Sequence, residues 1–131
     1  MRIDGRCHCG AIAYEAEIDP EKIFVCHCTD CQTLSGSAYR TVAVTKEGTF
    51  KLLSGEPKVY IKTADSGAER AQAFCSECGT PIYAAAPGEG AKVHAIRAGT
   101  ARQRDTLVPT AQTWCGSELS WVEDLASVRK V

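Results

Sequence analysis

A mainly β fold is predicted for this chain of 131 residues, and three features of the sequence predict it. Short apolar runs recur along the chain, and turn signals rich in glycine and proline separate them. One run, Lys58–Lys62 (KVYIK), alternates charged and apolar side chains, which is the period of a half-buried strand. Helical periodicity is weak and is confined to Asp30–Leu34 and Glu118–Leu125. Short strands at this spacing are typical of an all-β domain.

The first four expected strands are placed by their patterns and by the turns beside them. Ala11–Glu17 (AIAYEAE) alternates in part, and the turn signal Asp19-Pro20 separates it from Ile23–Val25. Ala38–Val44 (AYRTVAV) and Thr49–Ser54 lie on either side of a turn that contains a glycine.

The other four expected strands lie in the second half of the chain. Ser66-Gly67 separates Lys58–Lys62 from Ala71–Phe74. Pro81–Ala85 and Lys92–Ala98 follow, divided by a turn rich in glycine.

The length and composition limit the number of domains and the classes of partner that we expect. A chain of this length is expected to form one domain, here residues 1–131. The 15 basic and 16 acidic residues leave a net charge of −1, so neither nucleic acid nor a membrane surface is an expected partner. No apolar run approaches the length of a membrane-spanning helix, and the first residues lack the apolar stretch of a secretory signal. We therefore expect a cytoplasmic protein.

Eight cysteines are the most informative feature of the composition. Without a secretory signal, thiols are expected to stay reduced unless they bind metal or do redox chemistry. Cys115 stands alone. The other seven form three clusters: Cys7-His8-Cys9-Gly10, Cys26-His27-Cys28-Thr29-Asp30-Cys31 and Cys75-Ser76-Glu77-Cys78-Gly79.

The spacing within these clusters favours zinc over disulfides. A Cys-x-Cys disulfide closes a small, strained ring, whereas thiolates one or two residues apart chelate a tetrahedral zinc ion. Gly10 and Gly79 directly follow Cys9 and Cys78, and they suit the tight turn of such a pair because glycine accepts a positive φ.

The cysteines can be divided between metal ions in two ways. In the first, the two outer clusters form one closed, structural four-thiolate site. The CxCxxC cluster then offers three thiolates and an open position, which is the pattern of a catalytic zinc. In the second, Cys115 closes that site, and both zinc ions are structural. Spacing favours the first division and leaves the second open.

The order of these motifs resembles that of the glutathione-dependent formaldehyde-activating enzyme family, which includes the centromere protein V-like proteins. The resemblance extends over nearly the whole chain. The matching segments are Gly5–Gly10 (GRCHCG), Cys26–Cys31 (CHCTDC) with Ser35-Gly36-Ser37, and Phe74–Gly79 (FCSECG).

The resemblance implies a β-tent fold, built of small antiparallel sheets around a structural zinc, and two zinc ions per chain. It implies a carbon–sulfur lyase-type enzyme, because the family's named activity condenses formaldehyde with glutathione to S-hydroxymethylglutathione. The implied partner is a small thiol such as glutathione. The implied ligands are Cys7, Cys9, Cys75 and Cys78 for the structural zinc, and Cys26, Cys28 and Cys31 for the catalytic zinc.

Two positions depart from the family pattern. Gln32 follows the third thiolate of the central cluster, where the family often has an arginine. A cation beside the thiolates or near a substrate carboxylate is therefore missing. Cys115 is outside the pattern. Both departures bear on the substrate and not on the fold.

The chemistry expected at the open site needs further groups. A thiol that binds zinc loses its proton, and its thiolate attacks a small carbonyl. The carbonyl oxygen then needs a proton, for which the candidates are His27 and, in the following loop, Ser35 or Ser37. The carboxylates of glutathione need cationic partners, for which the candidates are Arg40, Arg70 and Arg97.

Several of these residues also have a plainer explanation. Alternation along the chain points His27 away from the metal, toward the surface or a supporting position. Cys115 is expected to be a buried apolar thiol, and Trp114 and Trp121 are expected to pack in the core or at its rim. A non-catalytic zinc module that binds a protein partner therefore competes with the enzyme. A redox role for the CxxC pair is weaker, because no thioredoxin-like pattern surrounds it.

Overall fold

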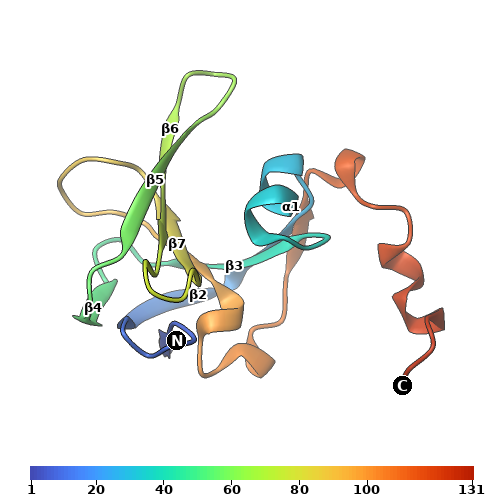
Figure 1. The fold of residues 1–131 in the computed structure, drawn as a ribbon, viewed down its shortest axis with the longest axis horizontal. Coiled ribbons are helices and arrows are strands. Elements are labelled where there is room, and N and C mark those ends of the chain that lie inside the picture. Colours follow the sequence, from blue (N-terminus) through green and yellow to red (C-terminus); the bar gives the residue numbers. More distant parts are fainter.

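Nine β-strands dominate the computed structural model, which describes residues 1–131 (Figure 1). The strands are β1 (Arg2–Arg6), β2 (Ala13–Cys26), β3 (Arg40–Thr45), β4 (Lys51–Ser54), β5 (Lys58–Thr63), β6 (Glu69–Phe74), β7 (Pro81–Ala85), β8 (Ala95–Arg97) and β9 (Ala111–Thr113). The predicted mainly β fold is confirmed. All strand pairs are antiparallel except that of β2 with β9.

The long strand β2 joins two parts of the sheet. Its first half pairs with β1 and β4, and its second half pairs with β3 and β9. Between these halves β2 advances from Ile18 to Ile23 while β3 moves only from Thr45 to Ala43. The turn predicted at Asp19-Pro20 is therefore wrong. The strand continues through Pro20, because the irregular pairing there makes no use of the N–H that proline lacks.

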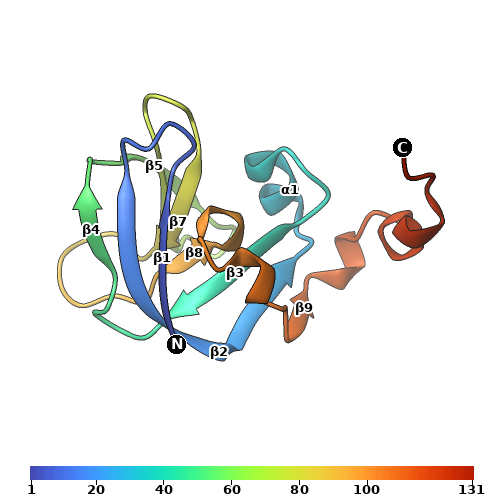
Figure 2. The same cartoon turned by 90° about the horizontal axis from the view of Figure 1, so that it is seen from below.

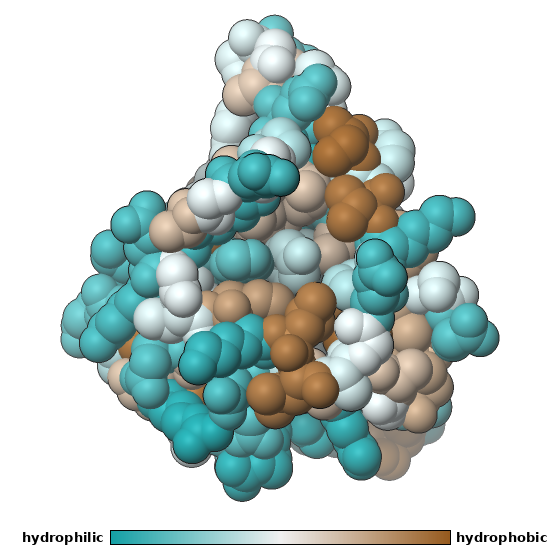
Figure 3. Space-filling view, turned by 90° about the vertical axis from the view of Figure 1, so that its left-hand side faces the viewer, coloured by the Kyte–Doolittle hydropathy of each residue, from teal (hydrophilic) through white to brown (hydrophobic).

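The remaining strands follow the order β3-β8-β7-β6-β5, which places β5 at an edge. Hairpin β5–β6 projects from the body (Figure 1). Most of β5 is exposed, so the half-burial predicted for Lys58–Lys62 is wrong. An edge strand on a projecting hairpin has no layer packed against it. Figure 3 shows exposed apolar groups beside polar ones along this hairpin and on the body below it.

Two short strands, β1 and β9, were not predicted. Arg2–Arg6 has two arginines, an aspartate and a glycine, and Ala111–Thr113 is only three residues long, so neither has a strand pattern of its own. Both form by pairing with β2. Tertiary pairing supplies what the local sequence lacks.

The helical content is small, as predicted. Helix α1 (Thr29–Ser35) confirms the candidate at Asp30–Leu34. The candidate at Glu118–Leu125 is instead a shifted 3₁₀ segment, η4 (Val122–Ser127). The other 3₁₀ turns are η1 (Ala98–Thr100), η2 (Arg104–Thr106) and η3 (Cys115–Ser117). None of these helical segments has the length and apolar character that a membrane-spanning helix needs.

The C-terminal segment after β9 lies beside the body and not within it (Figure 2). Trp114 is 70% exposed and Trp121 is 50% exposed, so the packing predicted for both, in the core or at its rim, is wrong. Cys115 is exposed as well, and its predicted burial is also wrong. No strand follows β9, so no further layer covers these side chains.

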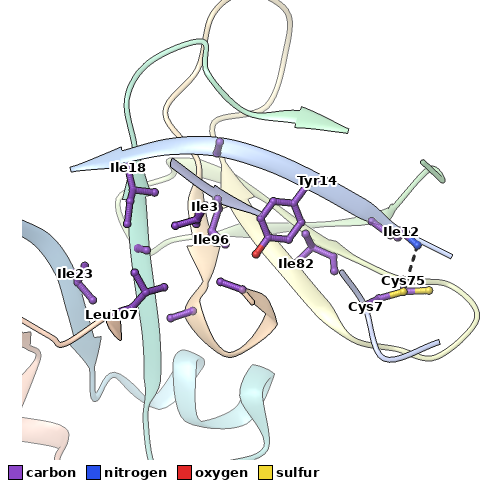
Figure 4. Packing of buried hydrophobic residues seen from close by; sticks show 14 residues of the cluster. Ile3, Cys7, Ile12, Tyr14, Ile18, Ile23, Cys75, Ile82, Ile96 and Leu107 are labelled. Atoms are coloured by element: carbon purple, nitrogen blue, oxygen red, sulfur yellow. Dashed lines mark hydrogen bonds between the residues drawn. The ribbon is translucent and has the colours of Figure 1, made fainter. Parts of the chain in front are cut away.

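Isoleucine is the most frequent residue of the core, which has Tyr14 at its centre (Figure 4). The Tyr14 hydroxyl lies 2.8 Å from the hydroxyl of Thr100, which satisfies it inside the core. Figure 4 shows Cys7 and Cys75 side by side at one end of this core, beyond Ile82. The hydrophobic cluster therefore continues directly into a group of thiols.

Candidate metal centres

A four-thiol cluster gathers the two outer motifs. Its sulfurs all lie within 4.8 Å of one another and belong to Cys7, Cys9, Cys75 and Cys78. The Cys9 sulfur is 3.6 Å from that of Cys7 and 3.8 Å from that of Cys75. These are free thiols, too far apart for disulfides. Four bonds of about 2.3 Å to a tetrahedral zinc ion separate sulfurs by about 3.8 Å, so the donor set fits zinc.

Tight turns place the sulfurs of this cluster. Gly10 and Gly79 have φ values of +83° and +77°, which confirms the positive φ expected after each cysteine pair. The Cys75 N–H donates to the Thr80 carbonyl at 2.9 Å and closes the second turn. In the first turn, the Ile12 N–H donates to the Cys7 sulfur at 3.3 Å (Figure 4). Backbone donors of this kind stabilise a thiolate.

Thr80 supports the four-thiol cluster from outside. Its hydroxyl lies 3.2 Å from the Cys78 sulfur and lowers the pKa of Cys78 to about 5. The same oxygen accepts a hydrogen bond from the His8 N–H at 3.1 Å. Thr80 therefore links the two outer cysteine motifs. The sequence analysis missed it, although its place directly after Cys78-Gly79 is a usable signal.

A three-thiol cluster forms within a single short segment. Cys26 ends β2, Cys28 caps the N-terminus of α1, and Cys31 lies in the first turn of that helix. Their sulfurs lie within 4.8 Å of one another. The Cys31 N–H donates to the Cys28 sulfur at 3.2 Å. Cys115 is not among the gathered sulfurs, so the geometry favours the first division of the cysteines.

His27 directly precedes the N-cap of α1, and Ser35 is the last residue of that helix. His27 is fully buried, so the surface position considered for it is wrong. Its Nε2 lies 2.7 Å from Gln112 Oε1, and its Nδ1 is buried without a partner. The Ser35 hydroxyl donates a long hydrogen bond of 3.4 Å to the carbonyl of Gln32. No hydrogen bond joins either side chain to a cysteine sulfur.

Gln32 fastens the C-terminal segment to the three-thiol cluster. Its amide donates to the carbonyl of His27 at 2.8 Å and to the carbonyl of Ser117 at 2.9 Å. An arginine at this position would bring a charge, whereas glutamine brings two neutral hydrogen bonds. In place of a cation, Gln32 therefore supplies two hydrogen bonds that hold the C-terminal segment against the segment that carries the three thiols.

Two buried arginines lie next to the three-thiol cluster. Arg40 is 6% exposed and Arg97 is 8% exposed. Arg97 donates to Gln72 Oε1 at 2.5 Å, and Arg40 donates to the same oxygen at 3.4 Å. Burial and the charge of Arg40 lower the pKa of Arg97 to about 9. The third candidate, Arg70, is less buried, and the structure does not join it to this pair.

A pocket of about 410 Å³ opens over these arginines. Its lining includes Arg40, Arg97 and Gln72, together with Leu34 of α1 and Tyr60 of β5. A larger hollow of about 780 Å³ lies beside the four-thiol cluster, with Cys7 and Thr80 in its lining. Four thiolates would fill a tetrahedral metal site there, whereas the smaller pocket lies over the two buried arginines.

An ion pair connects α1 with the projecting hairpin. Lys62 Nζ lies 2.8 Å from a carboxylate oxygen of Asp30. This carboxylate raises the pKa of Lys62. Figure 1 shows α1 and the hairpin on the same side of β3, and the ion pair bridges them.

Comparisons with known proteins identify the family of this chain. The profile of the family described as "Glutathione-dependent formaldehyde-activating enzyme" matches residues 2–117. A Schizosaccharomyces pombe protein described as an uncharacterized lyase is 33% identical over 80 residues, which is 61% of this chain and 55% of that protein. The chain thus spans about half the length of this curated relative.

A solved structure shares the fold. The crystal structure of a Rhodobacter sphaeroides protein matches with a TM-score of 0.62, covering 84% of this chain and 99% of that one. At 18% identity, this likeness concerns the fold alone.

Proposed function

The chain belongs to the glutathione-dependent formaldehyde-activating enzyme family, and from this premise we propose a zinc-dependent carbon–sulfur lyase-type activity. The proposed substrate is a small thiol adduct such as S-hydroxymethylglutathione. One observation carries the proposal: the three-thiol cluster gathers no fourth protein ligand, so a metal held there keeps a position for substrate.

Two zinc ions per chain are proposed, with different roles. The four-thiol cluster would hold a structural ion, because four thiolates fill a tetrahedral site. Cys26, Cys28 and Cys31 would hold the second ion. When bound there, zinc would favour the thiolate form of a substrate sulfur at neutral pH.

The proposed reaction balances without a further reactant. In the condensing direction the thiol gives up its proton, its sulfur bonds to the carbonyl carbon, and the carbonyl oxygen takes up a proton. The lyase direction reverses these changes. Ser35 is a more available proton carrier than His27, because its only hydrogen bond is long. The His27 ring is fully buried, and its Nε2 is bonded to Gln112.

The cellular setting is part of the proposal. We propose that residues 1–131 act as one zinc-binding domain in the cytoplasm. The eight cysteines are free thiols, which supports a reducing compartment.

The proposal is tested by titrating the two-zinc protein with glutathione and with S-methylglutathione in a calorimeter. Glutathione is expected to bind at least about tenfold more tightly, because only a free thiol can become a thiolate ligand. Cys28→Ser should abolish this preference while leaving the fold intact. Equal binding of the two ligands to the two-zinc protein would refute capture of the thiol.

A partner-binding zinc module is the second candidate. The exposed Trp114, Trp121 and Leu125 of the C-terminal segment favour it, because large apolar side chains at the surface are typical of interaction sites. Two zinc ions that resist a chelator equally would support this candidate over the enzyme, since a site with an open position releases its metal more readily.

A further inference from the structure

We propose that Arg40, Arg97 and Gln72 form a carboxylate-binding subsite beside the three-thiol cluster. In the proposed reaction, this subsite would hold a carboxylate of the glutathione-type substrate. The role of the subsite in positioning a substrate sulfur rests on the proposed function. The evidence for the subsite itself is the geometry of three strands and one pocket.

The register of the sheet brings these side chains together. Cys26 pairs with Arg40, and Val42, two residues further along β3, pairs with Arg97. Paired residues share a face of a sheet, and so do residues two apart on one strand. Arg40 and Arg97 therefore lie on the face that carries Cys26. Both guanidinium groups reach Gln72 Oε1 of β6, which fixes them in one place.

Neither guanidinium group has an acidic partner. The four ion pairs of the chain involve other residues. The Arg97 Nε is buried and lacks any hydrogen-bond partner. Two adjacent cations that are more than nine-tenths buried are costly to keep unless an anion joins them. The two planar guanidinium groups offer the paired N–H donors that a carboxylate accepts.

The cysteine thiolates do not account for the whole arrangement. Cys26 lies opposite Arg40 in the sheet, so a thiolate there would offset part of the positive charge. Yet the same two arginines are the only charged residues lining the 410 Å³ pocket, which contains no cysteine and no acidic residue. Leu34 and Phe74 give this pocket apolar walls that suit the methylene groups of a small thiol. A carboxylate on the ligand would give the two arginines the anionic partner that the lining of the pocket does not contain.

The test is a calorimetric titration of the two-zinc protein with S-methylglutathione and with the diethyl ester of that compound. Neither probe has a free thiol, so the result does not depend on capture of a thiol by zinc. The acid is expected to bind about 10- to 100-fold more tightly than the ester, as for charge-assisted hydrogen bonds in a buried site.

Single variants then locate the subsite. Arg40→Gln and Arg97→Gln should each weaken binding of the acid about tenfold and leave binding of the ester unchanged. Arg97→Lys should restore part of the loss, because lysine keeps the charge without the planar fork. Arg129→Gln is the matched control, since it removes an exposed arginine from the C-terminal segment, and it should change neither affinity.

Folding and zinc content are followed in the same samples. The expected result is two zinc ions per chain and an undiminished melting temperature in each arginine variant. Equal affinities of the wild-type protein for acid and ester would overturn the subsite. Loss of zinc from the variants with an unchanged ratio of acid to ester affinity would also overturn it. The protein could bind S-methylglutathione more tightly than its diethyl ester and yet bind glutathione no more tightly than S-methylglutathione. That result would support the subsite and refute capture of the thiol by zinc.

Discussion

The four-thiol and three-thiol clusters use the same ligand chemistry in opposite structural settings. The first joins segments that are 66 residues apart at Cys9 and Cys75, and two of its cysteines are buried at the end of the core. The second comes from six consecutive residues at the end of β2 and the start of α1. Its neighbours are buried arginines and a pocket.

This difference in setting teaches how one ligand type serves two purposes. Metal binding that joins distant segments contributes directly to folding free energy, because the unfolded chain holds no such site. Metal binding within one short segment constrains little of the chain. A local site at the edge of the core is therefore free to keep an open position and to face a ligand.

The largest expected effect follows from breaking the four-thiol cluster. Cys75→Ser removes a buried ligand, so the zinc no longer joins the two segments. We expect the variant to lose at least about 5 kcal/mol, which is the whole stability of a typical domain, and to be unfolded at 37 °C. Circular dichroism and zinc analysis measure this outcome. Cys115→Ser, at an exposed thiol, is the control and should melt like the wild-type protein. A folded Cys75→Ser protein with two zinc ions would contradict the structural role.

The matching change in the three-thiol cluster should separate activity from folding. Cys28→Ser is expected to lower the rate of S-hydroxymethylglutathione cleavage at least about 1,000-fold, since one ligand of the substrate-binding metal is gone. The melting temperature should fall by only a few degrees, about 1 kcal/mol. Loss of the fold in this variant would remove the distinction between the two clusters.

A chelator should distinguish the clusters in the wild-type protein. Brief exposure is expected to remove about one zinc ion per chain, from the three-thiol cluster, because that site lacks a fourth protein ligand. Far-ultraviolet circular dichroism should stay unchanged. Elemental analysis before and after exposure provides the count, and re-addition of zinc should restore it. If both ions leave together with loss of structure, the two sites are not independent.

A change in the arginine pair is expected to have a smaller effect, and to raise the free energy of unfolding instead of lowering it. Arg97→Met replaces a buried, unpaired cation with an apolar side chain of similar length. We expect this variant to be more stable by about 1 kcal/mol, since burying an unpaired charge is costly. Thermal unfolding without ligand measures the gain. Arg129→Met, at an exposed position, should not change the melting temperature. A less stable Arg97→Met protein would show that the guanidinium group supports the fold.

The smallest expected effect concerns β1, which leads into the four-thiol cluster. Hydrogen bonds from Arg102 and Gln103 lower the pKa of Asp4 from 3.8 to about 2. A folded-state pKa below the unfolded value means that Asp4 stabilises the fold above pH 3.8 and loses this contribution as the pH falls toward 2. Asp4→Asn should therefore reduce the fall in melting temperature over this range. Asp105→Asn, at another exposed carboxylate, is the control and should leave the curve unchanged. Identical pH curves for Asp4→Asn and the wild-type protein would contradict the linkage.

Local patterns predicted most of the fold. Pro81–Ala85 was predicted with its observed bounds, and the candidate helix at Asp30–Leu34 is within one residue of α1 at each end. The errors lie where tertiary contacts override local signals. β2 passes through Pro20, β1 and β9 form on β2 without strand patterns, and β5 is exposed at an edge.

The sequence by itself determined which thiols can bind a metal, because chelating pairs depend on spacing within a few residues. It also determined the turns at Gly10 and Gly79, where only glycine adopts a positive φ without strain. These are properties of short segments, and short segments carry them wherever they lie in a fold.

Only the tertiary structure decided which groups surround the thiols. Cys115 lies outside both clusters, Thr80 supports one of them, and Arg40 and Arg97 meet beside the other. Each of these facts depends on strand register, because a shift of one residue in the pairing moves a side chain to the opposite face of the sheet. Register is fixed by the burial of the whole sheet, and no short stretch of sequence contains that information.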